Sequence, residues 1–306
     1  MSFTCFFLRS TFAQNHCNML FLHRIFNSVW LMDRDYAINY LPIISSYIKG
    51  ERTVQASKED KYFDNNNGVL FAEKSKDLYH ISDYGGWTAP EEAPKNSIAI
   101  LSITGAITKY DQNCGPSGMA TKSSLLNRCY TNPNIQGIIV KQDTGGGEGG
   151  AMRLFNETVS KRNKPVIGFV DDFSCSAGMG NLASCDLIIA NSPMARIGSI
   201  GTYMTVADYT EYFKKEGINL IEVYASDSTD KNKEYYEAIK GNVEPLRVIA
   251  NKFNDAFLEM IEQQRGDVLT ADRKIWGTGK VFFAEEALQI GLIDKIDSFD
   301  NILNYF

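Results

Sequence analysis

Residues Gly137–Gly180 read GIIVKQDTGGGEGGAMRLFNETVSKRNKPVIGFVDDFSCSAGMG, and this stretch decides the fold class. It opens with the apolar run GIIV, which is followed by DTGGGEGG at Asp143–Gly150, a loop with five glycines in eight residues. A helical pattern leads to a second apolar run, PVIGFV at Pro165–Val170, and then to FSCSAGMG, whose small residues begin another helix. Strands that alternate with helices predict an α/β layered fold.

The same alternation continues on both sides of this stretch. Three further β-branched runs predict strands, at Ser97–Ile107, Leu187–Ala190 and Leu220–Tyr224. A strand, a helix and a strand are also expected near the end of the chain. The longest predicted helix has an apolar stripe, which we expect to lie in the core or in a subunit interface. The predicted helices are Ala120–Tyr130, Gly150–Arg162, Asp208–Glu216 and Glu244–Arg265.

The first 95 residues have a different character. We expect residues 1–31 to be a non-native or mis-started extension with Met32 as the natural start, because the segment is rich in Phe and Leu but is interrupted by polar residues. Residues 32–95 are interpreted as an N-terminal amphipathic helix, over 32–50, followed by a polar arm. Residues 96–306 then form the main domain.

Bulk composition argues against several classes of protein. A formal net charge of −6 over 306 residues provides no basic stripe to neutralise phosphates, so no nucleic-acid partner is expected. The six cysteines lack C-x-x-C spacing, so we expect reduced thiols and no zinc site. Because the sequence contains no window of 18 consecutive apolar residues, a membrane-spanning helix is not expected either.

The glycine loop allows two interpretations. Three of its glycines fit the G-x-G-x-x-G fingerprint of a nucleotide-dependent oxidoreductase, and two acids follow at the distance of a ribose-binding carboxylate. These residues are Gly145, Gly147 and Gly150, with Asp171 and Asp172. In the second interpretation the loop amides hold a developing oxyanion. Glu148 favours the second, because its charge would lie inside a pyrophosphate cradle.

Two serines of FSCSAGMG, Ser174 and Ser176, lie after a strand and at the start of a helix. The free amides of a first helical turn can stabilise the oxyanion that forms when a serine hydroxyl attacks a carbonyl group. A serine at this place can also simply cap the helix. A histidine base is not expected, because all three histidines lie in the first quarter of the chain. A Ser–Lys pair becomes the natural candidate, with Lys231 or Lys233 as base unless both are solvated surface lysines.

From about Ser97 to its end, the chain resembles the signal peptide peptidase A / protease IV family of serine peptidases, peptidase family S49, which includes phage capsid-maturation proteases. Four segments carry the resemblance and occur in the order found in the family. They are TGAI at Thr104–Ile107, NPNIQGIIVKQDTGGG at Asn132–Gly147, KPVIGFVDDFSCSAGMGNLASCDLIIANSPMARIGSIGT at Lys164–Thr202, and FFAEEALQIGLIDKI at Phe282–Ile296.

The resemblance implies an α/β fold of the ClpP/crotonase type, built from repeated β-β-α units, with an N-terminal helical or irregular appendage. It implies that Ser176 is the nucleophile and that the amides of Gly146 and Ala177 form the oxyanion hole. The family's base lysine corresponds best to Lys231, with Lys233 as the second candidate. The chain departs from the family at three places. Gly145 replaces the usual proline of the loop, Ala177–Gly178 follows the nucleophile where the family commonly has two glycines, and the lysine segment has a different spacing.

The function implied by the resemblance is that of a serine endopeptidase with a Ser–Lys dyad and with no metal or organic cofactor. Its substrates would be peptides or proteins, either signal-peptide remnants or phage or prophage capsid proteins. A homo-oligomeric ring is expected, with phage capsid or scaffold proteins as further partners. The expected location is the cytoplasm, with membrane-peripheral or virion and prohead association as alternatives. Three other functions stay open: the oxidoreductase, a catalytically inactive scaffold relative, and an acyl-CoA enzyme of the crotonase branch.

Overall fold

The computed structural model describes residues 30–32, 69–75, 78–81, 89–112 and 116–306 of the chain. They divide into two compact units. Trp30–Gly201 together with Ala256–Phe306 is called the sheet unit, and Thr202–Asp255 is called the small unit. The helix expected over residues 32–50 lies outside the described residues, except for Met32.

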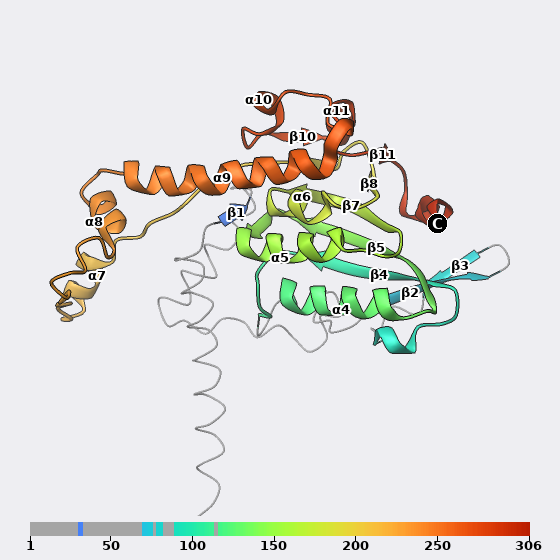
Figure 1. Ribbon diagram of the computed structural model, residues 1–306, viewed down its shortest axis with the longest axis horizontal. Helices are drawn as coiled ribbons and strands as arrows, with labels where there is room; N and C mark the ends of the chain where they lie inside the picture. The colour runs from blue at the N-terminus through green and yellow to red at the C-terminus, as the bar shows by residue number, and fades with distance from the viewer. Residues whose placement is uncertain (1–29, 33–68, 76–77, 82–88, 113–115) are drawn as a thin grey trace, which may run out of the picture. The chain divides into compact units, whose positions relative to one another are not determined.

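Among the described residues, a nine-stranded sheet forms the centre of the sheet unit (Figure 1). The strands are β2 (Leu70–Ser75), β3 (Leu78–Ile81), β4 (Ser97–Thr104), β5 (Ile135–Thr144), β7 (Val166–Cys175), β8 (Leu187–Ala190), β9 (Arg196–Gly198), β10 (Val281–Phe283) and β11 (Lys295–Ile296). Their order is β10-β9-β7-β5-β4-β2-β3, with β8 also on β7 and β11 beside β8. Strands β4, β5, β7 and β8 run parallel, which confirms the predicted α/β class.

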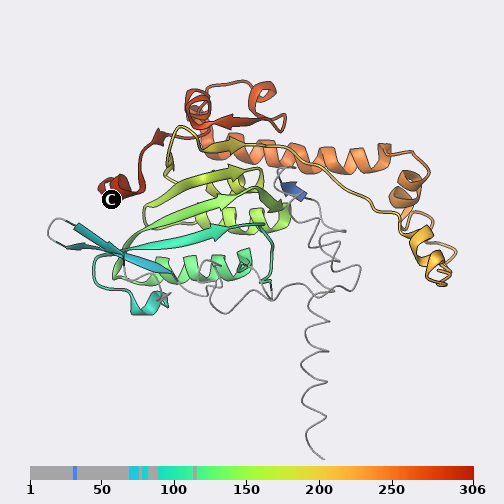
Figure 2. The same ribbon diagram turned by 180° about the vertical axis from the view of Figure 1, so that it is seen from behind.

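Helices cover one face of this sheet. Side chains from all of these helices share one apolar cluster with the strands, among them Leu126, Phe155, Leu182 and Ile261. In the view of Figure 2 the strands lie in front of α4 and α5. The helices of the sheet unit are α4 (Met119–Thr131), α5 (Gly149–Ser160), α6 (Ala177–Leu182), the end of α9 (Glu244–Arg265), α10 (Arg273–Trp276) and α11 (Ala284–Gln289).

The opposite face is covered by the C-terminal segment. Ile302 and Leu303 of η3 (Phe299–Tyr305) belong to a second apolar cluster, which also contains Ile100. The next residue along β4, Leu101, belongs to the first cluster. Successive side chains of a strand point to opposite faces, so the continuous apolar runs of the sequence reflect strands that are buried on both faces.

Most predicted elements of the sheet unit are confirmed, with two differences. β5 and β7 extend beyond their apolar runs to Thr144 and Cys175, because the polar residues at their ends have hydrogen-bond partners inside the fold. β2 pairs with β4, so the sheet includes part of the segment that we expected to be an arm. No helix in the part of the chain that the structure describes is long and apolar enough to span a membrane.

The small unit contains α7 (Thr210–Lys215), α8 (Lys233–Ile239) and the beginning of α9. The strand predicted at Leu220–Tyr224 is wrong, because this segment has no regular secondary structure. Its alternating apolar residues are not covered within the unit, and Ile221 and Val223 are 86% and 90% exposed. An apolar alternation becomes a strand only beside a partner strand, and no described strand pairs with this segment.

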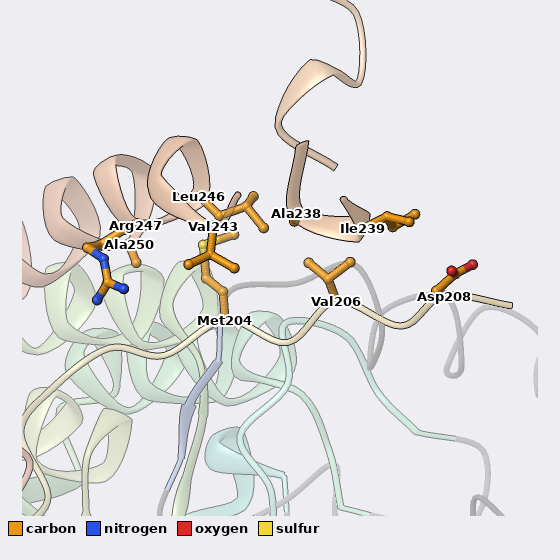
Figure 3. A pocket seen from close by; sticks show the side chains of 9 residues that line it. All are labelled: Met204, Val206, Asp208, Ala238, Ile239, Val243, Leu246, Arg247 and Ala250. Atoms are coloured by element: carbon orange, nitrogen blue, oxygen red, sulfur yellow. The ribbon is translucent and has the colours of Figure 1, made fainter. Parts of the chain in front are cut away.

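A pocket of about 460 Å³ lies within the small unit, beside residues 204–208, α8 and the beginning of α9 (Figure 3). Its lining is mostly apolar, with one acidic and one basic side chain. The lining residues are Met204, Val206, Asp208, Ala238, Ile239, Val243, Leu246, Arg247 and Ala250. None of these nine residues is a predicted catalytic residue, so the pocket is distinct from the chemistry expected from the sequence.

Candidate active site

The glycine loop and the serine segment follow two strands whose ends lie side by side. Thr144, the last residue of β5, is paired in register with Ser174 of β7. β5 leads into β6 (Gly146–Glu148), and β7 leads through Ser176 into α6. β6 and α6 are in contact. The structure thus brings together two predicted parts of the site at the carboxyl ends of parallel strands, where α/β folds usually bind their ligands.

Ser176 has a backbone conformation that residues other than glycine rarely adopt, with φ 53° and ψ −116°. Its amide donates to the Gly198 carbonyl over 2.6 Å, and its Oγ lies 3.5 Å from the Gly201 carbonyl oxygen. Ser176 is the N-cap residue of α6, yet its hydroxyl forms no capping hydrogen bond with the described residues. The helix-cap interpretation of Ser176 is therefore wrong. Strain of this kind is typical of functional positions.

Ser174, two residues earlier, has a structural role. It is fully buried, and its Oγ accepts a hydrogen bond from Gln142 Nε2 over 2.7 Å and lies 3.5 Å from Met179 Sδ. The same Gln142 amide donates to the Gly178 carbonyl over 3.0 Å. Gln142 therefore ties the end of β5 to the end of β7 and to the first turn of α6, and this holds the segment around Ser176 in place.

The amide of Gly146, the predicted oxyanion donor, is hydrogen-bonded to a side-chain hydroxyl in this structure. Its amide donates to Thr144 Oγ1 over 3.0 Å, and that hydroxyl donates to the Gly105 carbonyl over 2.5 Å. The φ of Gly146 is 110°, which a residue with a side chain would adopt only under strain. Ala177 is the first residue of α6, and an amide at that position has no acceptor within its helix. The oxyanion roles of Gly146 and Ala177 stay predictions, and for Gly146 the amide must leave Thr144 or be shared with the substrate.

The glycines of the loop allow close packing of backbones and do not form a phosphate cradle. A Cβ atom on Gly147 would lie 2.0 Å from the carbonyl oxygen of Ile107, the residue to which Gly147 is bridged. The Glu148 carboxylate accepts a backbone amide of the neighbouring segment over 2.8 Å, so a negative charge lies in the loop. Asp171, a predicted ribose-binding acid, forms an ion pair with Lys141 at 2.8 Å. These features do not suit a pyrophosphate.

Both candidate lysines belong to the small unit. Lys231 precedes α8, and Lys233 is its first residue. Both are exposed. Lys233 Nζ lies 3.1 Å from Asp230 Oδ1, whereas no acid among the described residues forms an ion pair with Lys231.

The sequence interpretation missed the supporting groups Gln142 and Thr144. A signal for them exists, since KQDT places polar residues at the end of an otherwise apolar run. The described cysteines are buried and form no disulfide with one another. Burial raises the pKa of both the Cys129 and the Cys185 thiols to about 12, so neither supplies a thiolate at neutral pH. Among the described residues, no group of histidine, cysteine and acidic side chains is placed to hold a metal ion.

Comparison with known proteins gives a consistent assignment. The model of the family "Peptidase family S49" matches residues 158–305. The chain is 25% identical over 213 residues to Protease 4 of Haemophilus influenzae, covering 68% of this chain and 34% of that protein. It is 28% identical over 211 residues to Capsid assembly protease C of Escherichia phage lambda, covering 66% of this chain and 46% of that protein. The chain thus spans less than half the length of these relatives.

Solved structures with a similar fold include a variant of the 1510-N membrane-bound stomatin-specific protease, with a TM-score of 0.44, 19% identity, and coverage of 68% of this chain and 83% of that one. A ClpP1 variant from Listeria monocytogenes has a TM-score of 0.41 and 14% identity, with coverage of 66% and 92%.

Proposed function

We propose that the chain, whose residues 158–305 match the model of peptidase family S49, is a serine endopeptidase with Ser176 as nucleophile and Lys231 as general base. The observation that carries this proposal is the backbone of Ser176, which lies in a strained conformation at the start of α6 with its hydroxyl uninvolved in capping among the described residues. Strain at a buried serine is retained when the exact direction of its hydroxyl matters. The neighbouring glycine strand β6 provides backbone amides beside it.

In the proposed reaction the neutral amine of Lys231 accepts the proton of the Ser176 hydroxyl while Oγ attacks the carbonyl carbon of the scissile peptide bond. The amides of Gly146 and Ala177 would stabilise the resulting oxyanion. The protonated lysine would then donate its proton to the leaving amine, which leaves an acyl-enzyme on Ser176. Water, activated by the same lysine, would hydrolyse this ester and regenerate the hydroxyl.

The base requires an environment that the small unit lacks when considered alone. A lysine is neutral near physiological pH only when it is desolvated or lies near other positive charges, and Lys231 is exposed. Near it in sequence, Ile221 and Val223 present bare apolar side chains. Soluble proteins usually cover such clusters in an interface. The exposed segment supports the proposal of a homo-oligomer in which a neighbouring copy covers the lysine segment.

The proposed substrates are peptides or unfolded protein segments. The name of one relative, Capsid assembly protease C, supports cleavage of phage structural proteins, whereas Protease 4 is named only as a protease. Signal-peptide remnants, which the family resemblance implies, are the first candidate class and phage structural proteins are the second. The second is our preferred candidate, in line with the phage-type relatives. Incubation with each class of substrate and mass spectrometry of the products would distinguish them.

The function itself is tested by incubating the full chain with an unstructured protein such as casein and following its fragments. We expect cleavage by the wild-type chain and none by Ser176→Ala. Equal cleavage by both chains would refute the assignment. The oxidoreductase alternative predicts quenching or enhancement of NADH fluorescence on addition of the protein, which the loop geometry does not favour. An inactive scaffold relative would leave every tested substrate uncut.

A further inference from the structure

A short segment from the beginning of the chain lies along the glycine strand. Residues Trp30–Met32 form β1, which pairs antiparallel with β6. The register pairs Trp30 with Glu148, Leu31 with Gly147, and Met32 with Gly146. Together they form a two-stranded sheet apart from the main one. More than a hundred residues separate the two strands in the sequence, so their pairing is not a consequence of a local turn.

The hydrogen bonds of β6 show which of its backbone groups β1 covers. The carbonyl of Gly146 accepts the Ile107 amide over 2.9 Å, and the amide of Glu148 donates to the Ile107 carbonyl over 2.9 Å. Successive residues of a strand turn their N–H and C=O groups to opposite edges. The amide and carbonyl of Gly147 therefore face the other edge, where Leu31 is its partner.

This edge of β6 is suited to hold an extended peptide. β6 itself is in contact with α6, which begins directly after Ser176, and β1 runs along this edge toward Gly146, the predicted oxyanion donor. Two of the three residues of β6 are glycines, and the carboxylate of Glu148 already accepts a backbone amide. The edge therefore offers backbone groups rather than side chains, which is how a sheet edge recognises an added strand of almost any sequence.

We propose that β1 occupies the position of a peptide substrate on β6, so that the chain's own residues 30–32 cover the site until a substrate strand displaces them. This proposal requires Trp30 and Leu31 to be part of the native protein, in contrast to the start at Met32 expected from the sequence. The inference rests on the proposed peptidase function of Ser176. It adds an intramolecular competitor to that function.

The test uses proline to remove one amide of β1 at a time in the full chain. Leu31→Pro removes the N–H group that faces Gly147, and Met32→Pro is the matched control, because the amide at position 32 faces away from β6. The readout is the rate at which a fluorophosphonate probe labels Ser176. Since one hydrogen bond contributes about 1 kcal/mol, Leu31→Pro should be labelled about fivefold faster than Met32→Pro and wild type. Equal labelling rates of the two proline variants would overturn the proposal.

A second measurement does not depend on catalysis. In chains that also carry Ser176→Ala, hydrogen exchange of the Gly147 amide should be about fivefold faster with Leu31→Pro than with Met32→Pro. If the exchange differs in this way but the probe labels none of the chains that retain Ser176, the strand pairing is supported and the proposed function of Ser176 fails. If labelling occurs at Ser176 while exchange of the Gly147 amide is the same in both variants, the peptidase function stands and the inference is overturned.

Discussion

The serine edge of the sheet unit and the lysine segment of the small unit differ in how their side chains are held. Ser174 and Ser176 are buried, and hydrogen bonds between 2.6 and 3.0 Å, made by Gln142 and by backbone groups, fix the segment that contains them. Lys231 is exposed, and apolar side chains nearby, such as Val223, are exposed too. The folding of one chain thus fixes the proposed nucleophile in place, whereas the proposed base requires that its surroundings be covered.

The largest expected effect compares the two serines of the sheet unit. Ser176→Ala should reduce peptidase activity by about 10⁴-fold or more, because no other group replaces the nucleophile. It should leave the free energy of unfolding nearly unchanged, since the Ser176 hydroxyl caps no helix within the described structure. Ser174→Ala should instead lower the free energy of unfolding by about 1–3 kcal/mol, because the buried amide of Gln142 loses an acceptor.

Urea denaturation and initial rates on the same preparations measure both quantities. A Ser176→Ala chain that is as unstable as Ser174→Ala would show that Ser176 supports the fold. If Ser174→Ala folds normally but has lost all activity, Ser174 would be the nucleophile and Ser176 the structural residue.

The second prediction concerns the small unit. Lys231→Ala should lower kcat by about 10²- to 10⁴-fold, the usual range for loss of a general base. Lys233→Ala should change it by less than about threefold, because the ion pair of Lys233 with Asp230 is exposed and exposed pairs contribute little. Steady-state kinetics of the two variants in parallel decides between the lysines. The opposite ranking would assign the base to Lys233.

The sheet unit could be predicted well because its strands are buried on both faces and its helices are amphipathic. Both kinds of burial produce a recognisable pattern of apolar residues in the sequence. The glycine loop and Ser176 could be placed at one edge because both follow parallel strands. The partners of Ser174 and Thr144 could not be predicted, since they depend on the register between β5 and β7. The predicted strand at Leu220–Tyr224 failed because a period-two pattern does not show whether a partner strand is present.

The third prediction returns to the sheet unit and tests whether the supporting hydroxyl of Thr144 aligns the loop. Thr144→Val keeps the shape of the side chain but leaves the Gly146 amide and the Gly105 carbonyl without their shared partner. We expect kcat to fall about tenfold with little change in KM, since one displaced donor weakens oxyanion stabilisation. Thr144→Ser retains the hydroxyl and should restore most of the rate. Equal losses in both variants would show that Thr144 acts through packing alone.

The smallest expected effect concerns a carboxyl group next to this site. Burial, together with the nearby carboxylates of Asp172 and Asp171, raises the pKa of Asp143 above its ordinary value. The folded protein therefore holds this proton more tightly than the unfolded chain. The associated stability is present below the unfolded-state pKa and is lost as the pH rises through the folded-state pKa.

Asp143→Asn removes this titration. It should raise the free energy of unfolding slightly at about pH 7. At about pH 3 it should change it little, because the Asp143 carboxyl of the wild-type chain is then largely protonated in both the folded and the unfolded state. Urea titrations at the two pH values measure the difference. A loss of stability at neutral pH would show that the ionised form of Asp143 is favoured by the fold.

The central claim is that Ser176 is the nucleophile of an S49-type peptidase and that Ser174 supports it. It is tested most directly by treating the native chain with a fluorophosphonate probe and locating the modified residue by peptide mass spectrometry. We expect a single adduct on Ser176, which is absent from Ser176→Ala and retained in Ser174→Ala. An adduct on Ser174, or no adduct on a chain that cleaves peptides, would contradict it.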